Sequence, residues 1–182
     1  MPANPQEVYF DYRNPLGRFR VCLMAQKISR VQLLPLTKPS DAVQTKKIPA
    51  AIKHFLDAYC LGRSVSAQAE WLRPAATDFA QKIYNMLLSV PFGQVTTYGE
   101  LAQQAGYTAQ HARAVGQVMN NNPWPLFVPC HRVISSGNRL GGFGAGLEMK
   151  MTLLAHEGVV LPLPHAQPAH FNTPLAQVTY AF

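Results

Sequence analysis

A change in hydrophobic period along the chain is the strongest constraint on its fold. Near the N-terminus, apolar residues alternate with polar ones on both sides of a turn at residues 14–17. The alternating apolar residues are Val8, Phe10 and Tyr12 before this turn and Phe19, Val21 and Leu23 after it. A period of two is typical of strands with one buried face, so the segment predicts a β-hairpin. The apolar segment at residues 28–36 is expected to add a third strand.

The period becomes helical from residue 49 onward. Pro49 is predicted to open a helix that ends near Gly62, and a second helix is expected from Thr77 or Asp78 to Ser89. The apolar face of the first helix consists of Ile52, Phe55, Leu56 and Tyr59. The patterns predict an α/β fold with a small N-terminal α/β domain and connector at 1–76 and a mostly helical domain at 77–160. A Pro-rich tail, to which the sequence assigns no function, follows at 161–182.

Residues 97–120 have the pattern of two short helices joined by a tight turn. Thr97 and Glu100 have capping-box spacing, so the first helix is expected to begin at Tyr98 and end at Gly106. Its predicted buried residues are Tyr98, Leu101, Ala102 and Ala105. The second helix, from about residue 109 to 120, is expected to bury Ala112, Val115, Gly116 and Met119 and to expose Gln110, Arg113, Ala114 and Gln117. This pattern fits a helix-turn-helix and an ordinary helical hairpin about equally well.

The charge distribution favours a polyanionic partner without deciding it. The net charge is +7, and residues 101–147 contain no Asp or Glu but carry Arg113, Arg132 and Arg139. A phosphate backbone can lie along such a segment without repulsion. No apolar run approaches the ~20 residues of a membrane span, and the first residues lack the build of a signal peptide. A cytoplasmic protein without a membrane partner is therefore expected.

The chain has three cysteines, Cys22, Cys60 and Cys130. They are too few and too scattered for a disulfide scaffold or a metal site, so no metal is predicted and a thiol is left free for chemistry. The apolar segment 126–128 is expected to form a short strand that ends at Cys130. Taken singly, a cysteine in this position is more often a small buried hydrophobe than a nucleophile.

A base or a positive field is needed to make Cys130 nucleophilic, because a free thiol is mostly protonated at neutral pH. His131 is adjacent, but neighbours on an extended strand point to opposite faces, so contact requires a turn just after Pro129 or a bridging water. Glu157 is a candidate third member that orients the imidazole. The glycines at 141–146 are either simple turn formers or positions at which the backbone approaches a ligand closely.

The sequence from Pro129 to Val133, PCHRV, resembles the active-site signature of the O6-alkylguanine-DNA alkyltransferases, the methylated-DNA–protein-cysteine methyltransferases. Other stretches resemble the family in the same order: residues 91–93, Thr97 and Tyr98, residues 112–116, Asn122, Pro123 and Pro125, the glycine-rich residues 141–147, and residues 154–158. The resemblance covers residues 77–160 and is weaker over 1–76. It implies that the helical pair is a helix-turn-helix.

The resemblance implies a catalytic role for five residues. Cys130 accepts the alkyl group, His131 acts on it as a base through a water, and Glu157 holds His131. Asn122 braces the turn that presents Cys130, and Tyr98 donates a hydrogen bond to the flipped guanine. Backbone groups of Val133 and of the loop formed by Phe143, Gly144 and Ala145 recognise the base, in a pocket that also includes Pro125.

For DNA binding, the resemblance implies that the second helix of the pair docks in the minor groove. Arg113 enters the duplex in place of the extruded nucleotide, since a guanidinium can stack on bases and bind the orphaned partner. Ala112, Ala114, Gly116 and Gln117 are expected on the helix surface that lies close to the DNA.

The function implied is irreversible transfer of an alkyl group from O6-alkylguanine, and less so from O4-alkylthymine, in double-stranded DNA to Cys130. A monomer that reacts once and uses no metal or organic cofactor is expected. One alternative is a non-catalytic helix-turn-helix sensor of alkylated DNA. A more distant alternative is a Cys-His hydrolase, which needs an oxyanion hole and turns over many times.

Overall fold

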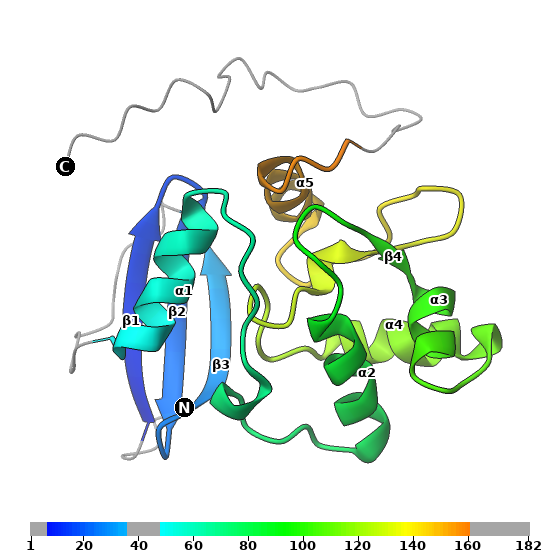
Figure 1. The fold of residues 1–182 in the computed structure, drawn as a ribbon, viewed down its shortest axis with the longest axis horizontal. Helices are drawn as coiled ribbons and strands as arrows, with labels where there is room; N and C mark the ends of the chain where they lie inside the picture. Colours follow the sequence, from blue (N-terminus) through cyan, green and yellow to red (C-terminus); the bar gives the residue numbers. More distant parts are fainter. Residues whose placement is uncertain (1–6, 36–47, 161–182) are drawn as a thin grey trace.

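The computed structural model describes residues 7–35 and 48–160, with a small sheet at one end and a group of helices at the other (Figure 1). The sheet is antiparallel in the order β1 (Glu7–Asn14), β2 (Gly17–Met24), β3 (Lys27–Leu34). The predicted hairpin and third strand are confirmed, and the third strand ends at Leu34. The tail predicted at 161–182 lies outside the described residues.

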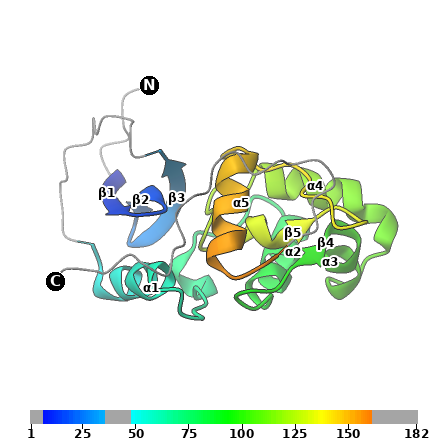
Figure 2. The ribbon, with the colours of Figure 1, turned by 90° about the horizontal axis from the view of Figure 1, so that it is seen from above.

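Helix α1 (Ala50–Cys60) lies along one face of the sheet (Figure 2). Its four predicted apolar residues are buried, as expected for an amphipathic helix, and Gly62 adopts a left-handed conformation with φ 69° just beyond the C-cap. The helix also reaches beyond the sheet. The Phe55 ring stacks on Phe127 at a centroid distance of 4.7 Å, which ties α1 to the segment that precedes Cys130.

The remaining elements are, in chain order, η1 (Ala69–Trp71), α2 (Asp78–Leu88), β4 (Thr96–Thr97), α3 (Tyr98–Gln104), η2 (Ala109–His111), α4 (Ala112–Asn120), η3 (Cys130–Arg132), β5 (Val133–Ile134) and α5 (Leu147–His156). Strands β4 and β5 pair in parallel. Helix α5 stands between the sheet and helices α2, α3 and α4, which form the far end of the molecule (Figures 1 and 2).

The helical pair predicted at 97–120 is α3 followed by η2 and α4. Thr97 and Glu100 form the expected capping box, with the Thr97 amide donating to the Glu100 carboxylate at 2.8 Å. Leu101 and Ala102 are buried, whereas Tyr98 and Ala105 are only half-buried. In α4, Val115 and Met119 are buried, but Ala112 and Gly116 are also only half-buried. The predicted outward residues Gln110, Arg113, Ala114 and Gln117 are exposed.

One cluster of buried hydrophobic residues extends from the sheet through α1 to α2, α4 and α5. Two hydrogen bonds join strand β3 to the segment after α4: Val31 N–H donates to the Pro123 carbonyl at 2.7 Å, and the Trp124 indole donates to the Ile28 carbonyl at 2.9 Å. The domain boundary near residue 76 stays a prediction. No helix in residues 7–35 or 48–160 has the length and apolar character that crossing a bilayer requires.

Candidate active site

The strand predicted at residues 126–128 is wrong: the segment is a buried turn. Pro123, Pro125 and Pro129 lack the N–H groups that a strand ladder uses, and Leu126 has a φ of 78°. The Asn122 side chain takes the place of a ladder partner. Its amide nitrogen donates to the Val128 carbonyl at 2.9 Å, and its oxygen accepts from the Trp124 N–H at 3.0 Å. Asn122 therefore holds the turn that leads into Cys130, as expected of a bracing residue.

Cys130 is the first residue of the 3-10 turn η3. The sequence predicted that contact between Cys130 and His131 requires either a turn just after Pro129 or a bridging water, and η3 is such a turn. The cysteine is 6% exposed. Burial raises the pKa of its thiol to about 11, while a hydrogen bond from Asn122, the charge of Lys150 and nearby backbone amides act in the opposite direction. At neutral pH the group is therefore a thiol, and it needs a base that can remove its proton.

His131 is fully buried, and its Nε2 lies 2.7 Å from Glu157 Oε1. Burial lowers the pKa of His131 below its usual value and outweighs the opposing effect of Glu157. A neutral imidazole has one N–H, and Nε2 must carry it because the Glu157 carboxylate can only accept. Nδ1 is left with a free lone pair and has no hydrogen-bond partner in the described part of the chain. Nδ1 is therefore a buried, unprotonated ring nitrogen on the residue that follows Cys130 in the chain.

Glu157 is the centre of the buried polar network. Besides His131, its carboxylate accepts from Arg132 Nε at 2.8 Å and Nη2 at 2.9 Å, from the Tyr59 hydroxyl at 3.0 Å and from the Gly93 amide at 3.0 Å. Burial alone raises the pKa of Glu157, but hydrogen bonds from His131 and Arg132 outweigh it and lower the pKa to about 2. Burial is the main reason that the imidazole is neutral, and the charge of Arg132, which counteracts that of Glu157, acts in the same direction on the pKa of His131.

Lys150 is a second buried cation, which the sequence analysis missed together with Arg132 and Tyr59. Its ammonium donates to the carbonyls of Val133 at 2.7 Å, of Leu140 and of Gly142. Burial lowers the pKa of Lys150 to about 8. A signal existed, because Lys150 lies three, four and seven residues before the buried Leu153, Leu154 and Glu157, which is the spacing of one helix face.

Cys130 lines two adjoining hollows. One, of about 420 Å³, also includes Tyr98, Gly116, Gln117, Phe143 and Gly144. The other, of about 320 Å³, includes Asn122, Pro125, Phe143, Gly144 and Ala145 and reaches strand β3. Val133 lies outside the lining of both, and its carbonyl already accepts from Lys150. The structure thus brings together most of the predicted pocket residues, and the part expected of Val133 stays a prediction.

Tyr98 stands at the start of α3 in the wall of the first hollow. Burial raises the pKa of its phenol, and the charge of Cys130 adds to this effect. The glycine loop adapts to the ring: a Cβ on Gly141, which has a φ of 67°, would lie 2.9 Å from the Tyr98 hydroxyl and 2.9 Å from Ser135 Oγ. Glycine is therefore required at position 141, because it permits the close approach.

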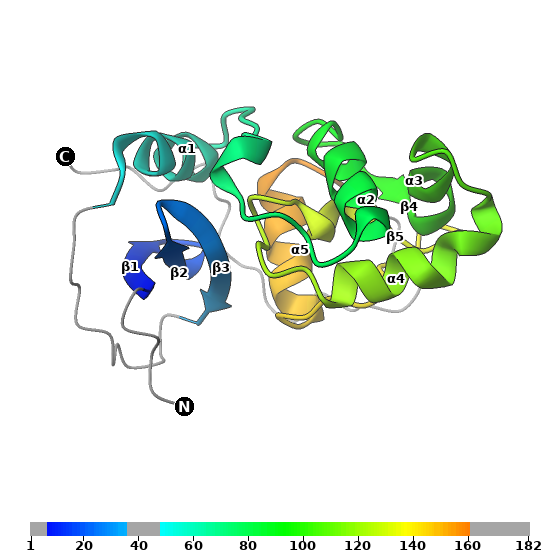
Figure 3. The same cartoon turned by 90° about the horizontal axis from the view of Figure 1, so that it is seen from below.

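Helix α4, which contains the residues predicted to meet DNA, lies along an outer edge of the helical part of the molecule (Figure 3). Arg113 is exposed and has no hydrogen bond or ion pair within residues 7–35 and 48–160. Ala114 and Gln117 are also exposed, and the half-buried Gly116 faces the first hollow. The arrangement places an unpaired guanidinium on the helix that borders the Cys130 hollow.

Comparisons with known proteins connect this geometry to a family. Residues 78–159 match the family described as "6-O-methylguanine DNA methyltransferase, DNA binding domain". A methylated-DNA–protein-cysteine methyltransferase of Methanosarcina acetivorans is 37% identical over 154 residues, which cover 82% of this chain and 97% of the relative. The one of Cricetulus griseus is 33% identical, covering 88% of this chain and 85% of the relative. The crystal structure of Mycobacterium tuberculosis OGT in complex with DNA is similar, with a TM-score of 0.67 and 30% identity, covering 82% of this chain and 92% of that one.

Proposed function

The chain belongs to the methylated-DNA–protein-cysteine methyltransferases, a family of DNA-repair proteins, and we propose that it removes alkyl groups from O6-alkylguanine in double-stranded DNA by transferring them to its own Cys130. The observation that carries this assignment is the buried Cys130 thiol followed in the chain by a buried, neutral histidine whose Nδ1 has no partner among the described residues. O4-alkylthymine is proposed as a poorer substrate.

The first step is removal of the thiol proton. His131 Nδ1 accepts it through a bridging water, and the imidazolium that forms is stabilised by the Glu157 carboxylate 2.7 Å from Nε2. The buried Lys150 ammonium stabilises the thiolate at the same time, since its charge lowers the pKa of Cys130. Both effects favour the thiolate within a site where burial opposes it.

The second step is displacement at carbon. The sulfur electron pair forms a bond to the alkyl carbon while the bond from that carbon to O6 breaks and its electron pair remains with guanine. Tyr98 is suited to donate a hydrogen bond to the leaving base, because the raised pKa of its phenol keeps it protonated at neutral pH. The thioether at Cys130 has no leaving group of comparable quality, so each molecule reacts once.

The lesion reaches Cys130 from the DNA surface. Helix α4 is proposed to dock in the minor groove, with Ala112, Ala114, Gly116 and Gln117 close to the DNA. Arg113 fills the stack that the extruded nucleotide vacates. We place the reaction in the cytoplasm, where DNA is accessible and thiols stay reduced, and assign it to a monomer, because all proposed site residues come from one chain.

The test is the stoichiometry of transfer. Protein incubated with excess duplex DNA that contains O6-methylguanine should gain one methyl group by intact mass and then stop, with one unmodified guanine formed per protein molecule. Binding of the lesion without any gain in mass would contradict alkyl transfer and favour the non-catalytic sensor. Continued release of product beyond one equivalent would contradict a stoichiometric acceptor.

A further inference from the structure

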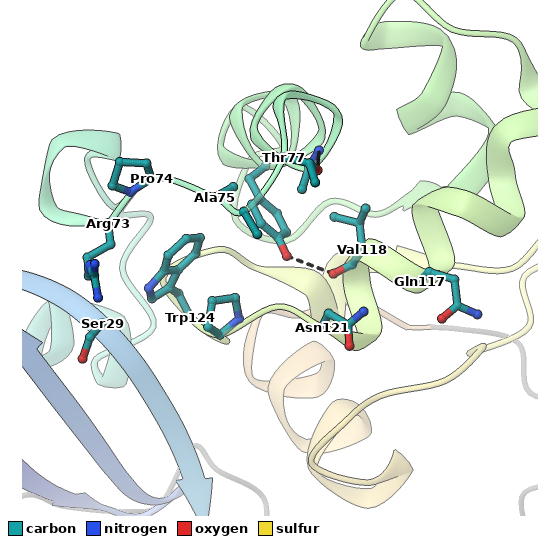
Figure 4. A pocket seen from close by; sticks show the side chains of 13 residues that line it. Ser29, Arg73, Pro74, Ala75, Thr77, Gln117, Val118, Asn121 and Trp124 are labelled. Carbon is teal, nitrogen blue, oxygen red and sulfur yellow. Dashed lines mark hydrogen bonds between the residues drawn. The ribbon is translucent and has the colours of Figure 1, made fainter. Parts of the chain in front are cut away.

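A third hollow, of about 490 Å³, lies beside α4 and contains no part of the proposed catalytic site (Figure 4). Its walls come from β3, from the connector before α2, from α2 and from α4. Its lining includes the polar residues Ser29, Arg73, Thr77, Tyr84, Gln117 and Asn121, and Figure 4 shows Trp124 between its two sides.

The third hollow and the Cys130 hollow lie on opposite flanks of α4. Residues advance by about 100° around a helix, so Gly116 and Asn120 share one flank, while Val118 and the C-cap residue Asn121 lie on the other. The first pair lines the Cys130 hollow, and the second pair lines the third hollow. Gln117 lines both and stands, with Arg113, on the ridge between them. Helix α4 is thus an exposed ridge with a hollow on each side.

A ridge of this kind has a direct consequence for a minor groove seated on it. The two strands of the duplex run along opposite sides of the groove, so one strand passes each flank of the inserted helix. The strand that carries the lesion has to pass the flank with Cys130. The intact strand then passes the flank that contains the third hollow.

The chemistry of the third hollow suits a sugar–phosphate backbone. Among the described residues no carboxylate lines it, and the exposed Arg73 supplies a positive charge. Within the described residues, the Arg73 side chain donates one hydrogen bond, from Nη1 to Met24 Sδ at 3.2 Å. Because a thioether is a weak acceptor, the guanidinium still has donors for a phosphate. Two hydrogen bonds fix the walls: Tyr84 donates to the Val118 carbonyl, and the Trp124 indole donates to the Ile28 carbonyl.

We propose that this hollow binds the backbone of the intact strand, opposite the lesion, with Arg73 as its phosphate contact. The inference rests on the proposed function, which supplies the duplex substrate. It assigns part of the DNA interface to the N-terminal part of the chain, beyond the helix-turn-helix.

The test compares Arg73→Ala with Arg63→Ala, a change of another exposed arginine of the connector, on duplex and on single-stranded DNA containing O6-methylguanine. For duplex DNA, Arg73→Ala should weaken binding by about three- to tenfold and reduce the slope of log affinity against log salt by about one, as expected for one lost phosphate contact. Affinity for the single strand and the rate of methyl transfer from it should not change. Arg63→Ala should leave all four quantities unchanged.

A second variant tests the same hollow independently of Arg73. Asn121→Asp places a carboxylate in the lining and should also weaken only duplex binding, whereas Asn121→Lys should strengthen it. Unchanged duplex affinity, or an equal loss on both forms of DNA, would overturn the assignment to the intact strand. Methyl transfer by the unaltered protein is read out separately: its absence contradicts the proposed function, while its persistence with duplex binding unaffected by the variants contradicts only this inference.

Discussion

The charged groups around Glu157 and those on the outward side of α4 differ in their burial and in their partners. Glu157, His131 and Arg132 are each at most 5% exposed, and nearly all their polar atoms have partners within the protein. Arg113 on α4 is exposed and has none within the described residues. The buried network fixes protonation states and geometry before any substrate arrives. Arg113 on the surface helix is left in contact with solvent, as its proposed role in DNA binding requires.

Because of this difference, substitutions in the two regions should have different effects. A change in the buried network should alter both the chemical step and the stability of the fold, because leaving one charge of a buried pair uncompensated is costly. A change of the exposed Arg113 on α4 should alter only the reaction with duplex DNA. The predictions that follow test this separation.

The largest effect is expected for Glu157→Gln. The amide can donate to His131 Nε2, which favours the tautomer with hydrogen on Nδ1 and removes the base. Transfer should slow by about 100-fold or more at neutral pH, by analogy with loss of the carboxylate in a catalytic triad, and recover as the pH approaches the Cys130 pKa of about 11. The rate of methylation measured between pH 6 and 10 tests this. Glu148→Gln, an exposed change on α5, is the control and should have no effect.

The same variant should change the response to acid. Because the pKa of Glu157 is about 2 in the folded protein and roughly 4.3 in unfolded chains, its stabilisation is complete above the unfolded value. It is lost as the pH falls from about 4 toward 2. Denaturant unfolding of Glu157→Gln should show a stability lower by about 3–5 kcal/mol at pH 7 and a weaker acid dependence over that range. Equal acid dependence in both proteins would contradict the role of this carboxylate.

A smaller and more selective effect is expected for Arg113→Ala. A base inside a duplex must be extruded before it reaches a buried thiol, and unstacking costs a few kcal/mol. The variant should repair duplex O6-methylguanine about tenfold more slowly, while its reaction with free O6-benzylguanine, if the pocket admits that base, stays the same. Arg13→Ala on β1 serves as the control. Equal losses on both substrates would show that Arg113 supports the pocket or the fold and does not assist extrusion.

The smallest effect is expected for Tyr59→Phe. Tyr59 lies on α1 and connects this helix to the network around Glu157. The change keeps the ring contacts with Phe92 and His156 but removes one donor from Glu157 Oε1. With fewer donors the carboxylate holds the His131 proton more strongly, so the acid limb of the pH–rate profile should move to higher pH and the rate should fall a few-fold. Tyr12→Phe removes a comparable bond to Asp57 on the same helix and should leave the profile unchanged. An equal shift of the pH–rate profile in both variants would mean that Tyr59 acts only through the stability of the fold.

The sequence predicted those features that local patterns determine. The hairpin, the capping box at Thr97 and the exposed face of α4 follow from periodicity and from side-chain bonds over three residues, and the structure confirms them. The turn before Cys130 was mistaken for a strand, because an apolar run hides the effect of the prolines that flank it. The Glu157 hub was only partly predicted, since Arg132 lies 25 residues away and Tyr59 lies 98 residues away along the chain. Periodicity predicts burial but not the partner of a buried charge.

The most direct test of the central claim is to locate the transferred methyl group among the three cysteines. All three are buried, and burial raises the pKa of Cys60 to about 12. Only Cys130 combines the lining of a hollow beside Tyr98 with an adjacent, partner-free imidazole nitrogen in the described structure. After reaction with O6-methylguanine duplex, a peptide mass map should place one methyl group on the peptide that contains Cys130, and Cys130→Ser should bind the duplex without gaining mass. A methyl group on Cys22 or Cys60, or transfer that persists in Cys130→Ser, would contradict the account.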